Sequence, residues 1–148
     1  MVKILFVTLW VTLCTSMIYG QEISDANVVM ESHFSLKIEG FKKAKGEVRI
    51  AVFDSKESYT KDPVYAVVIP VEKLECTWEV TDLPYGEYAI AVYHDVNVNG
   101  KLDTNFLGIP KERYGFSNNA RGRFGPAKWK DAKFSVDGAT TEATIRIK

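Results

Sequence analysis

One stretch of this 148-residue chain has the residue types and spacing of a calcium-binding loop. Between positions 95 and 103, oxygen-bearing side chains occupy the first, third, fifth and ninth positions, and glycine occupies the sixth. Calcium takes about six to eight oxygen ligands, glycine permits the sharp reversal, and the seventh residue binds through its backbone carbonyl. The predicted metal ligands are Asp95, Asn97, Asn99, Lys101 and Asp103.

Two features distinguish this stretch from a complete helix–loop–helix calcium loop. Its twelfth position is Phe106 instead of a bidentate glutamate, and it follows a predicted strand. We expect Leu102 to anchor the loop and other oxygens to complete the shell, from Asn105, Ser117, Asn118, Asn119 or Asp131. The alternative is an Asn-Gly turn that binds no ion, because Asn and Asp favour turns.

A cluster of basic residues follows the candidate calcium loop in the sequence. Lys and Arg predominate between positions 111 and 130, and Arg113, Arg121 and Arg123 lie among aromatic residues. Guanidinium groups bind carboxylates and phosphates and stack on aromatic rings. We therefore predict that these three arginines form a ligand-binding rim for an anionic saccharide or a phosphate group. The alternative is an ordinary solvated loop surface.

His94 is the candidate for catalysis, as a general base or metal ligand next to Asp95. Successive side chains of a strand point to opposite faces, so we expect His94 to share a face with Tyr88 and Asp95 to point away. The sequence contains no nucleophile elbow, zinc-protease motif or phosphate loop. We therefore predict a protein that is not an enzyme.

The elements that must position these residues are predicted to be strands. Residues 34–38, 48–52 and 74–81 alternate between apolar and polar, whereas 64–71 and 87–94 are apolar runs. The run 87–94 is apolar on both faces, which predicts a central strand. Residues 134–136 and 143–147 predict a closing hairpin around Asp137-Gly138. The pattern predicts an all-β fold, an antiparallel sandwich of about seven strands.

A tight turn precedes the predicted central strand. Pro84 and Gly86 favour the turn, and Tyr88 is placed to bond its hydroxyl back to this corner. The pattern resembles the strand-entry turn of transthyretin-like and related Ig-like modules, and we assign it a structural role. After that strand, residues 96–130 show no regular periodicity. We expect an ordered loop that buries its large apolar residues, Phe106, Leu107, Tyr114, Phe116, Phe124 and Trp129.

The N-terminus predicts export. Lys3 precedes an uncharged apolar stretch, and Gly20 lies at the predicted cleavage point, so residues 1–20 are predicted to be a signal peptide. Cys14 would leave with it, and Cys76 is expected to be a small buried residue. Residues 21–148 then form one domain without a transmembrane span. The balance of 19 basic and 19 acidic residues argues against a nucleic-acid partner.

Several motifs resemble one bacterial family. They are Leu-Pro-Tyr-Gly-Glu-Tyr at 83–88, His-Asp-Val-Asn-Val-Asn-Gly-Lys-Leu-Asp-Thr-Asn at 94–105, Phe-Leu-Gly-Ile-Pro at 106–110, Tyr-Gly-Phe-Ser-Asn-Asn-Ala-Arg-Gly at 114–122 and Phe-Gly-Pro at 124–126. The chain resembles the bacterial exported family called domain of unknown function 2141. Members carry an acidic residue after the first Asp, where this chain has Val96. The resemblance implies an exported domain and no assigned reaction.

These observations favour one function over two alternatives. The favoured function is a periplasmic, cell-surface or secreted module whose calcium-organised loop presents a binding surface to an anionic saccharide or another protein. The first alternative is a purely structural domain that binds no metal. The second is a metal-dependent hydrolase that uses His94.

Overall fold

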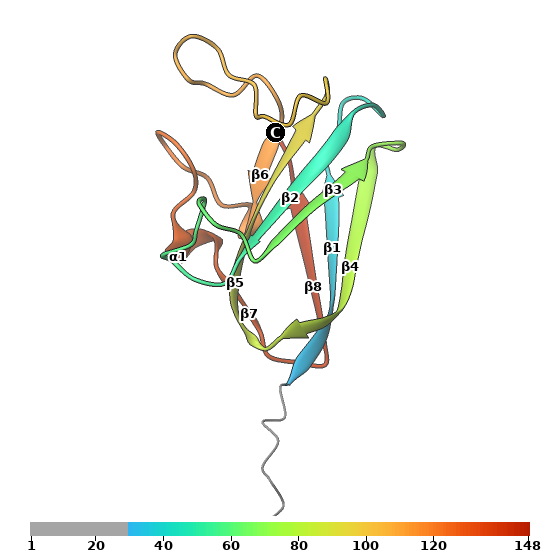
Figure 1. The fold of residues 1–148 in the computed structure, drawn as a ribbon, viewed down its shortest axis with the longest axis vertical. Helices are drawn as coiled ribbons and strands as arrows, with labels where there is room; N and C mark the ends of the chain where they lie inside the picture. Colours follow the sequence, from blue (N-terminus) through green and yellow to red (C-terminus); the bar gives the residue numbers. More distant parts are fainter. Residues whose placement is uncertain (1–29) are drawn as a thin grey trace, which may run out of the picture.

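The computed structural model describes residues 30–148, which form two sheets packed face to face (Figure 1). The eight strands, in chain order, are β1 (Glu31–Glu39), β2 (Glu47–Phe53), β3 (Tyr65–Pro70), β4 (Glu75–Pro84), β5 (Gly86–Asp95), β6 (Tyr114–Phe116), β7 (Phe134–Val136) and β8 (Thr140–Arg146). One turn of 3₁₀ helix, η1 (Ser117–Asn119), and one short helix, α1 (Trp129–Ala132), lie between β6 and β7. The predicted all-β sandwich is confirmed.

The first sheet has the order β4-β1-β8, and the second has the order β3-β2-β5-β6 with β7 also paired to β5. All pairings are antiparallel except that of β1 with β8, which is parallel. The predicted C-terminal hairpin is therefore wrong. The turn at Asp137-Gly138 does not fold one strand onto the next, because β7 pairs with β5 and β8 crosses to the other sheet.

The main core fills the space between the sheets. Alternate residues of β1, β2 and β5 point into it, and β8 adds Ile145. The alternation predicted from the sequence therefore identifies the inward faces, since only one face of these strands meets the opposing sheet.

A second apolar cluster explains why β5 is apolar on both faces. Residues 117–132 fold back over the outer face of the five-stranded sheet, where Ala127 and Ala132 pack with Phe53, Tyr59 and Phe116. Ile90 and Val92 of β5 belong to the main core, whereas Ala89 belongs to this cluster, so both faces of the strand are covered. Within the sheet, β5 lies between β2 and β6. The prediction of a central strand is confirmed.

The long segment 96–130 is ordered but not uniformly buried. It contains β6, η1 and the start of α1, and it buries Phe116 while Tyr114 and Trp129 are partly buried. The expectation of burial is wrong for Phe106, Leu107 and Phe124, which are exposed. These three residues lie in turns and bends between strands, and none of them belongs to either apolar cluster.

The predicted corner at Tyr88 is confirmed, because its hydroxyl donates a hydrogen bond to the carbonyl of Pro84 over 2.9 Å. Cys76 is partly buried against the main core, and burial raises the pKa of its thiol. Among residues 30–148, no helix has the length and apolar character needed to span a bilayer. The predicted signal peptide, residues 1–20 with Cys14, lies outside the described residues.

Candidate metal-binding loop

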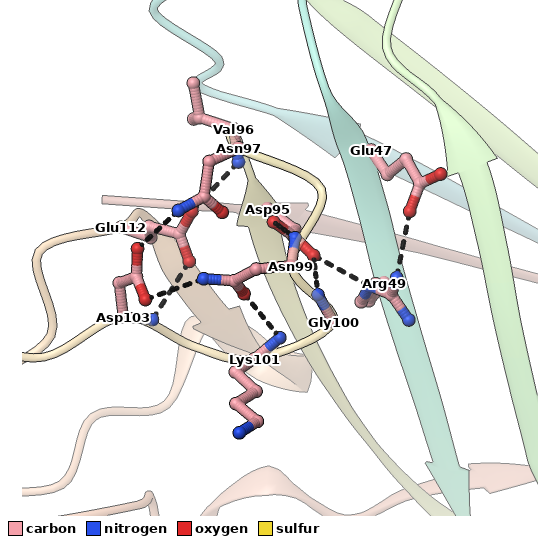
Figure 2. Close-up of polar contacts among 10 residues, drawn as sticks. All are labelled: Glu47, Arg49, Asp95, Val96, Asn97, Asn99, Gly100, Lys101, Asp103 and Glu112. Atoms are coloured by element: carbon pink, nitrogen blue, oxygen red, sulfur yellow. Dashed lines mark hydrogen bonds and ion pairs between the residues drawn. The ribbon is translucent and has the colours of Figure 1, made fainter.

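The candidate loop begins where β5 ends, at Asp95. This carboxylate is fully buried, and its Oδ2 accepts a hydrogen bond from Nε of Arg49 on β2 over 3.0 Å (Figure 2). Arg49 also donates from Nη2 to Glu47 over 3.0 Å. The neighbouring strand β2 therefore holds the first residue of the loop in place.

The Asp95 carboxylate also shapes the turn that follows. Its Oδ1 accepts the backbone N–H of Asn99 over 3.1 Å, and its Oδ2 accepts that of Gly100 over 2.7 Å. Burial alone would raise the pKa of the Asp95 carboxyl, but these backbone donors and Arg49 outweigh it, so the pKa lies below its usual range. Gly100 adopts φ +79°, which glycine tolerates. Asp95 thus organises the backbone of the loop.

Asp103 lies at the centre of the loop. Its two carboxylate oxygens accept hydrogen bonds from the side-chain amides of Asn97 over 2.8 Å and Asn99 over 2.9 Å. The Oδ1 of Asn99 in turn accepts the backbone N–H of Lys101 over 2.8 Å. All five residues predicted from the spacing are therefore joined by hydrogen bonds, since Asn99 also donates its backbone N–H to Asp95 (Figure 2).

Glu112 belongs to this loop although sequence reasoning missed it. Its carboxylate accepts the backbone N–H of Val96 over 2.9 Å and that of Asp103 over 3.1 Å (Figure 2). Glu112 lies nine residues beyond Asp103, and only the return of the chain from 104 to 111 brings it back. Glu112 lies outside the twelve positions of the calcium-loop pattern, so the spacing of residues in the sequence does not indicate that it contacts the loop.

The residues expected to complete a metal shell are not gathered around the loop. The Oδ1 of Asn105 accepts the backbone N–H groups of Leu107 and Ile109. Ser117 bonds to Ile90 and Ala132. The amide of Asn118 donates to the carbonyls of Asp131 and Lys133, and Asn119 bonds to Thr144 and Arg146. Leu102, the predicted anchor, is partly buried outside both core clusters.

The three predicted ligand-binding arginines do not converge on one site. Arg113 donates to the backbone carbonyls of Gly40 and Ile147, over 2.8 and 3.0 Å. Arg121 lies over the ring of Tyr114 and donates to the carbonyls of Tyr114 and Arg146. Arg123 lies over the ring of Phe124. Arg113 and Arg121 thus bind backbone of this chain.

His94 faces the core side, as predicted. Its ring packs edge-on against Phe41 with centroids 5.0 Å apart, and Nε2 donates to the carbonyl of Lys45 over 2.6 Å. A carbonyl only accepts, so Nε2 carries the hydrogen. His94 also lines a cavity of about 310 Å³ beside the loop, with Asp103, Glu112 and Lys111. Among residues 30–148, no group of three or more His, Cys, Asp or Glu side chains is clustered to hold a metal ion.

Comparison with known proteins identifies a family. Residues 36–144 match the model of the family described as an uncharacterized protein conserved in bacteria, the domain of unknown function 2141. No curated protein and no solved structure matches the chain. The match begins within β1, ends within β8 and includes the whole candidate loop. The chain therefore belongs to the bacterial family called domain of unknown function 2141, as its motifs predicted.

Proposed function

We propose that this protein is an exported, non-enzymatic binding module whose loop between β5 and β6 binds a calcium ion. The proposed ligands are the side chains of Asn97, Asn99 and Asp103 and the carbonyl oxygen of Lys101. Asp95 occupies the first position of the loop, where its carboxylate accepts the backbone N–H groups of Asn99 and Gly100. The ordered loop then presents a binding surface at one end of the sandwich.

The convergence of two amides on Asp103 carries this proposal. An asparagine amide has a donor and an acceptor on the same planar group, so turning it about its last torsion exchanges nitrogen for oxygen. Asn97 and Asn99 both reach the Asp103 carboxylate through nitrogen. Turning both amides would direct two neutral oxygens and one carboxylate toward the same point. That is the ligand chemistry that calcium prefers.

A purely structural turn is the competing function, and a specific observation favours it too. Asp95 accepts two backbone N–H groups and Arg49, while Glu112 accepts two further backbone N–H groups. These contacts make a self-contained turn that closes one end of the core. The two functions differ in one measurable property, which is the response of stability to calcium.

Thermal unfolding of the purified protein distinguishes the calcium-binding loop from the purely structural turn. After chelation, millimolar calcium should raise Tm, with magnesium as the comparison ion. A ligand at 100 times its dissociation constant stabilises the folded state by about 2.7 kcal/mol. For a domain of this size the expected rise is on the order of 5–15 °C.

Asp103→Ala is the decisive variant. Within residues 30–148, the hydrogen bonds to the Asp103 carboxylate come only from Asn97 and Asn99, both of which are exposed. The variant should fold and lose the calcium response. Asp131→Ala is the matched control, since Asp131 is exposed and lies on α1. Equal calcium responses in Asp103→Ala and the parent would contradict the metal site and leave the structural turn.

Export is tested separately by the mass of the mature protein recovered from fractionated bacteria. A chain that begins at Gln21 in the periplasmic, cell-surface or secreted fraction supports the proposal. A chain that keeps residues 1–20 in the cytoplasm contradicts it.

A further inference from the structure

The turn that follows the candidate loop exposes three large apolar side chains. Phe106 is 94% exposed, Leu107 is 67% exposed and Ile109 is 56% exposed. Figure 1 shows the segment between β5 and β6 projecting beyond the ends of the strands. An exposed apolar group of this kind is a usual feature of an interaction site.

The tip is held rigid by its own hydrogen bonds. The side chain of Asn105 accepts the N–H groups of Leu107 and Ile109 over 2.9 and 3.0 Å. The backbone adds bonds from Asn105 to Ile109 and from Gly108 to Asn105, and a bridge pairs Thr104 with Pro110. The apolar side chains are therefore presented on a fixed turn, which lowers the entropy cost of binding.

Basic side chains line a cavity beside the base of this tip. The cavity of about 310 Å³ beside the loop is lined by Lys42 and Lys43 from the turn after β1, and by Lys111 and Arg113 from the returning chain. Lys42, Lys43 and Lys111 are exposed. The acidic residues of the cavity, Asp103 and Glu112, already accept hydrogen bonds from the loop. Lys42, Lys43 and Lys111 thus line the same cavity as Asp103, from which the chain continues into the apolar tip.

We propose that this end of the molecule docks on a lipid bilayer that contains anionic phospholipids. Phe106, Leu107 and Ile109 enter the boundary between headgroups and acyl chains, and the three lysines lie at the level of the phosphates. A convex tip with apolar side chains at its apex and cations at its base matches the layers of such a surface, apolar inside and anionic outside. The inference extends the proposed binding module by naming its partner, and it does not depend on calcium.

Vesicle co-sedimentation tests the proposal with the purified protein. One set of vesicles is phosphatidylcholine alone, and the other is phosphatidylcholine mixed with phosphatidylglycerol. The parent should bind the anionic vesicles more tightly, and added salt should weaken binding because salt screens the lysines. The double variant Phe106→Ser and Leu107→Ser should bind at least about tenfold more weakly. Transfer of each apolar side chain from water into the bilayer contributes a large part of the binding free energy.

The chain offers matched controls for both parts of the surface. Phe124 is also 94% exposed, but on a different turn, so Phe124→Ser should bind as the parent does. Lys42→Glu with Lys43→Glu should reduce binding to anionic vesicles. Lys56→Glu with Lys61→Glu should not, because residues 54–64 connect β2 to β3 at the opposite end of the strands. Thermal unfolding of each variant confirms that it folds.

Each result decides one question. Absence of binding to either vesicle overturns the inference, as does equal loss in Phe124→Ser and in the Phe106 and Leu107 variant. Binding of a soluble anionic saccharide without vesicle binding also overturns it. A calcium-dependent Tm without vesicle binding keeps the metal loop and removes the membrane partner. Vesicle binding in chelator keeps the membrane partner, whatever the outcome for calcium.

Discussion

At the residue scale, the two aspartates of the loop have different roles although they carry the same functional group. Asp95 is buried and accepts Arg49 together with backbone N–H groups. Asp103 is partly exposed and accepts the side-chain amides of Asn97 and Asn99. Asp95 therefore supports the architecture of the loop, whereas Asp103 is the residue whose partners would have to turn in the calcium site proposed above.

We predict that Asp95→Ala destabilises the protein in chelator, with no calcium present. The substitution leaves Arg49 without its buried partner and leaves the N–H groups of Asn99 and Gly100 without an acceptor, at a cost of about 2–4 kcal/mol. Asp103→Ala should cost less than about 1 kcal/mol, because exposed polar contacts contribute little. Urea unfolding measures both. Equal losses would show that the loop depends on Asp103 as much as on Asp95.

Tyr59 provides a second test at this scale. Its ring packs against Phe53 and Trp129, and within residues 30–148 its buried hydroxyl has no hydrogen-bond partner. An unpaired buried hydroxyl destabilises the folded state, so Tyr59→Phe should stabilise it by about 1 kcal/mol. Thermal unfolding at neutral pH measures the gain. A loss of stability would mean that the hydroxyl is satisfied, for example by an ordered water.

The same residue predicts a dependence on alkaline pH. Burial raises the pKa of Tyr59 to about 12, so the folded state holds the phenol proton more tightly than the unfolded state does. The resulting stability is complete below the unfolded pKa of about 10 and is lost as pH rises toward 12. The advantage of Tyr59→Phe over the parent should therefore widen across that window. An advantage that stays constant would contradict the shift.

At the element scale, the turn after β1 and the end of β5 form one unit. Gly46 adopts φ +78°, and a Cβ at this position would overlap the carbonyl oxygen of Asp95. The position of the candidate loop therefore depends on a turn about fifty residues earlier in the chain. Arg113 reinforces the same end by donating to the carbonyls of Gly40 and Ile147.

Two glycines with nearly the same φ angle, Gly46 and Gly108, test this coupling. Gly108 adopts φ +75°, but a Cβ there would meet nothing within 4 Å. Gly108→Ala should therefore cost only the conformational strain, about 1 kcal/mol. Gly46→Ala should cost at least about 2 kcal/mol more, because it adds a clash with backbone. Chemical denaturation of both variants gives the difference, and similar costs would contradict the close approach of the turn to Asp95.

At the scale of the whole molecule, the C-terminal strand closes the sandwich. The strand β8 pairs with β1 in parallel, and its Ile145 is fully buried in the main core. Residues from the two ends of the described chain thus form one sheet. Such long-range pairing depends on folding of the entire domain, since the loop between the paired strands must close first.

Ile145→Ala should therefore destabilise the whole domain by about 2–5 kcal/mol, the usual cost of a large cavity in a core. Thr144 is exposed on the same strand, and Thr144→Ala should change stability by no more than about 0.5 kcal/mol. Denaturant midpoints monitored by tryptophan fluorescence and by circular dichroism should coincide for both variants. Separate transitions would show that β8 can leave without unfolding the sandwich.

The local features of this protein are determined by the sequence itself. Alternation along β1 and β2 identifies their core faces, and apolar residues on both faces of β5 identify it as central. The corner at Tyr88 and the contacts of Asp103 follow from spacing within a few residues. At the Tyr88 corner and around Asp103 the interacting residues are close in the chain, so the conformation of one segment brings them together. Along the strands, the sequence shows which faces are apolar and therefore which faces must be covered.

The tertiary structure alone decided the remaining features. It separates β7 from β8, brings Glu112 to the loop, directs Arg113 to the carbonyls of Gly40 and Ile147, and leaves Phe106 and Phe124 exposed. The presence of a phenylalanine or an arginine in the sequence does not indicate which distant element will cover its side chain or accept its hydrogen bonds. Those partners are selected when the two sheets pack together, because only then do residues far apart in the chain become neighbours.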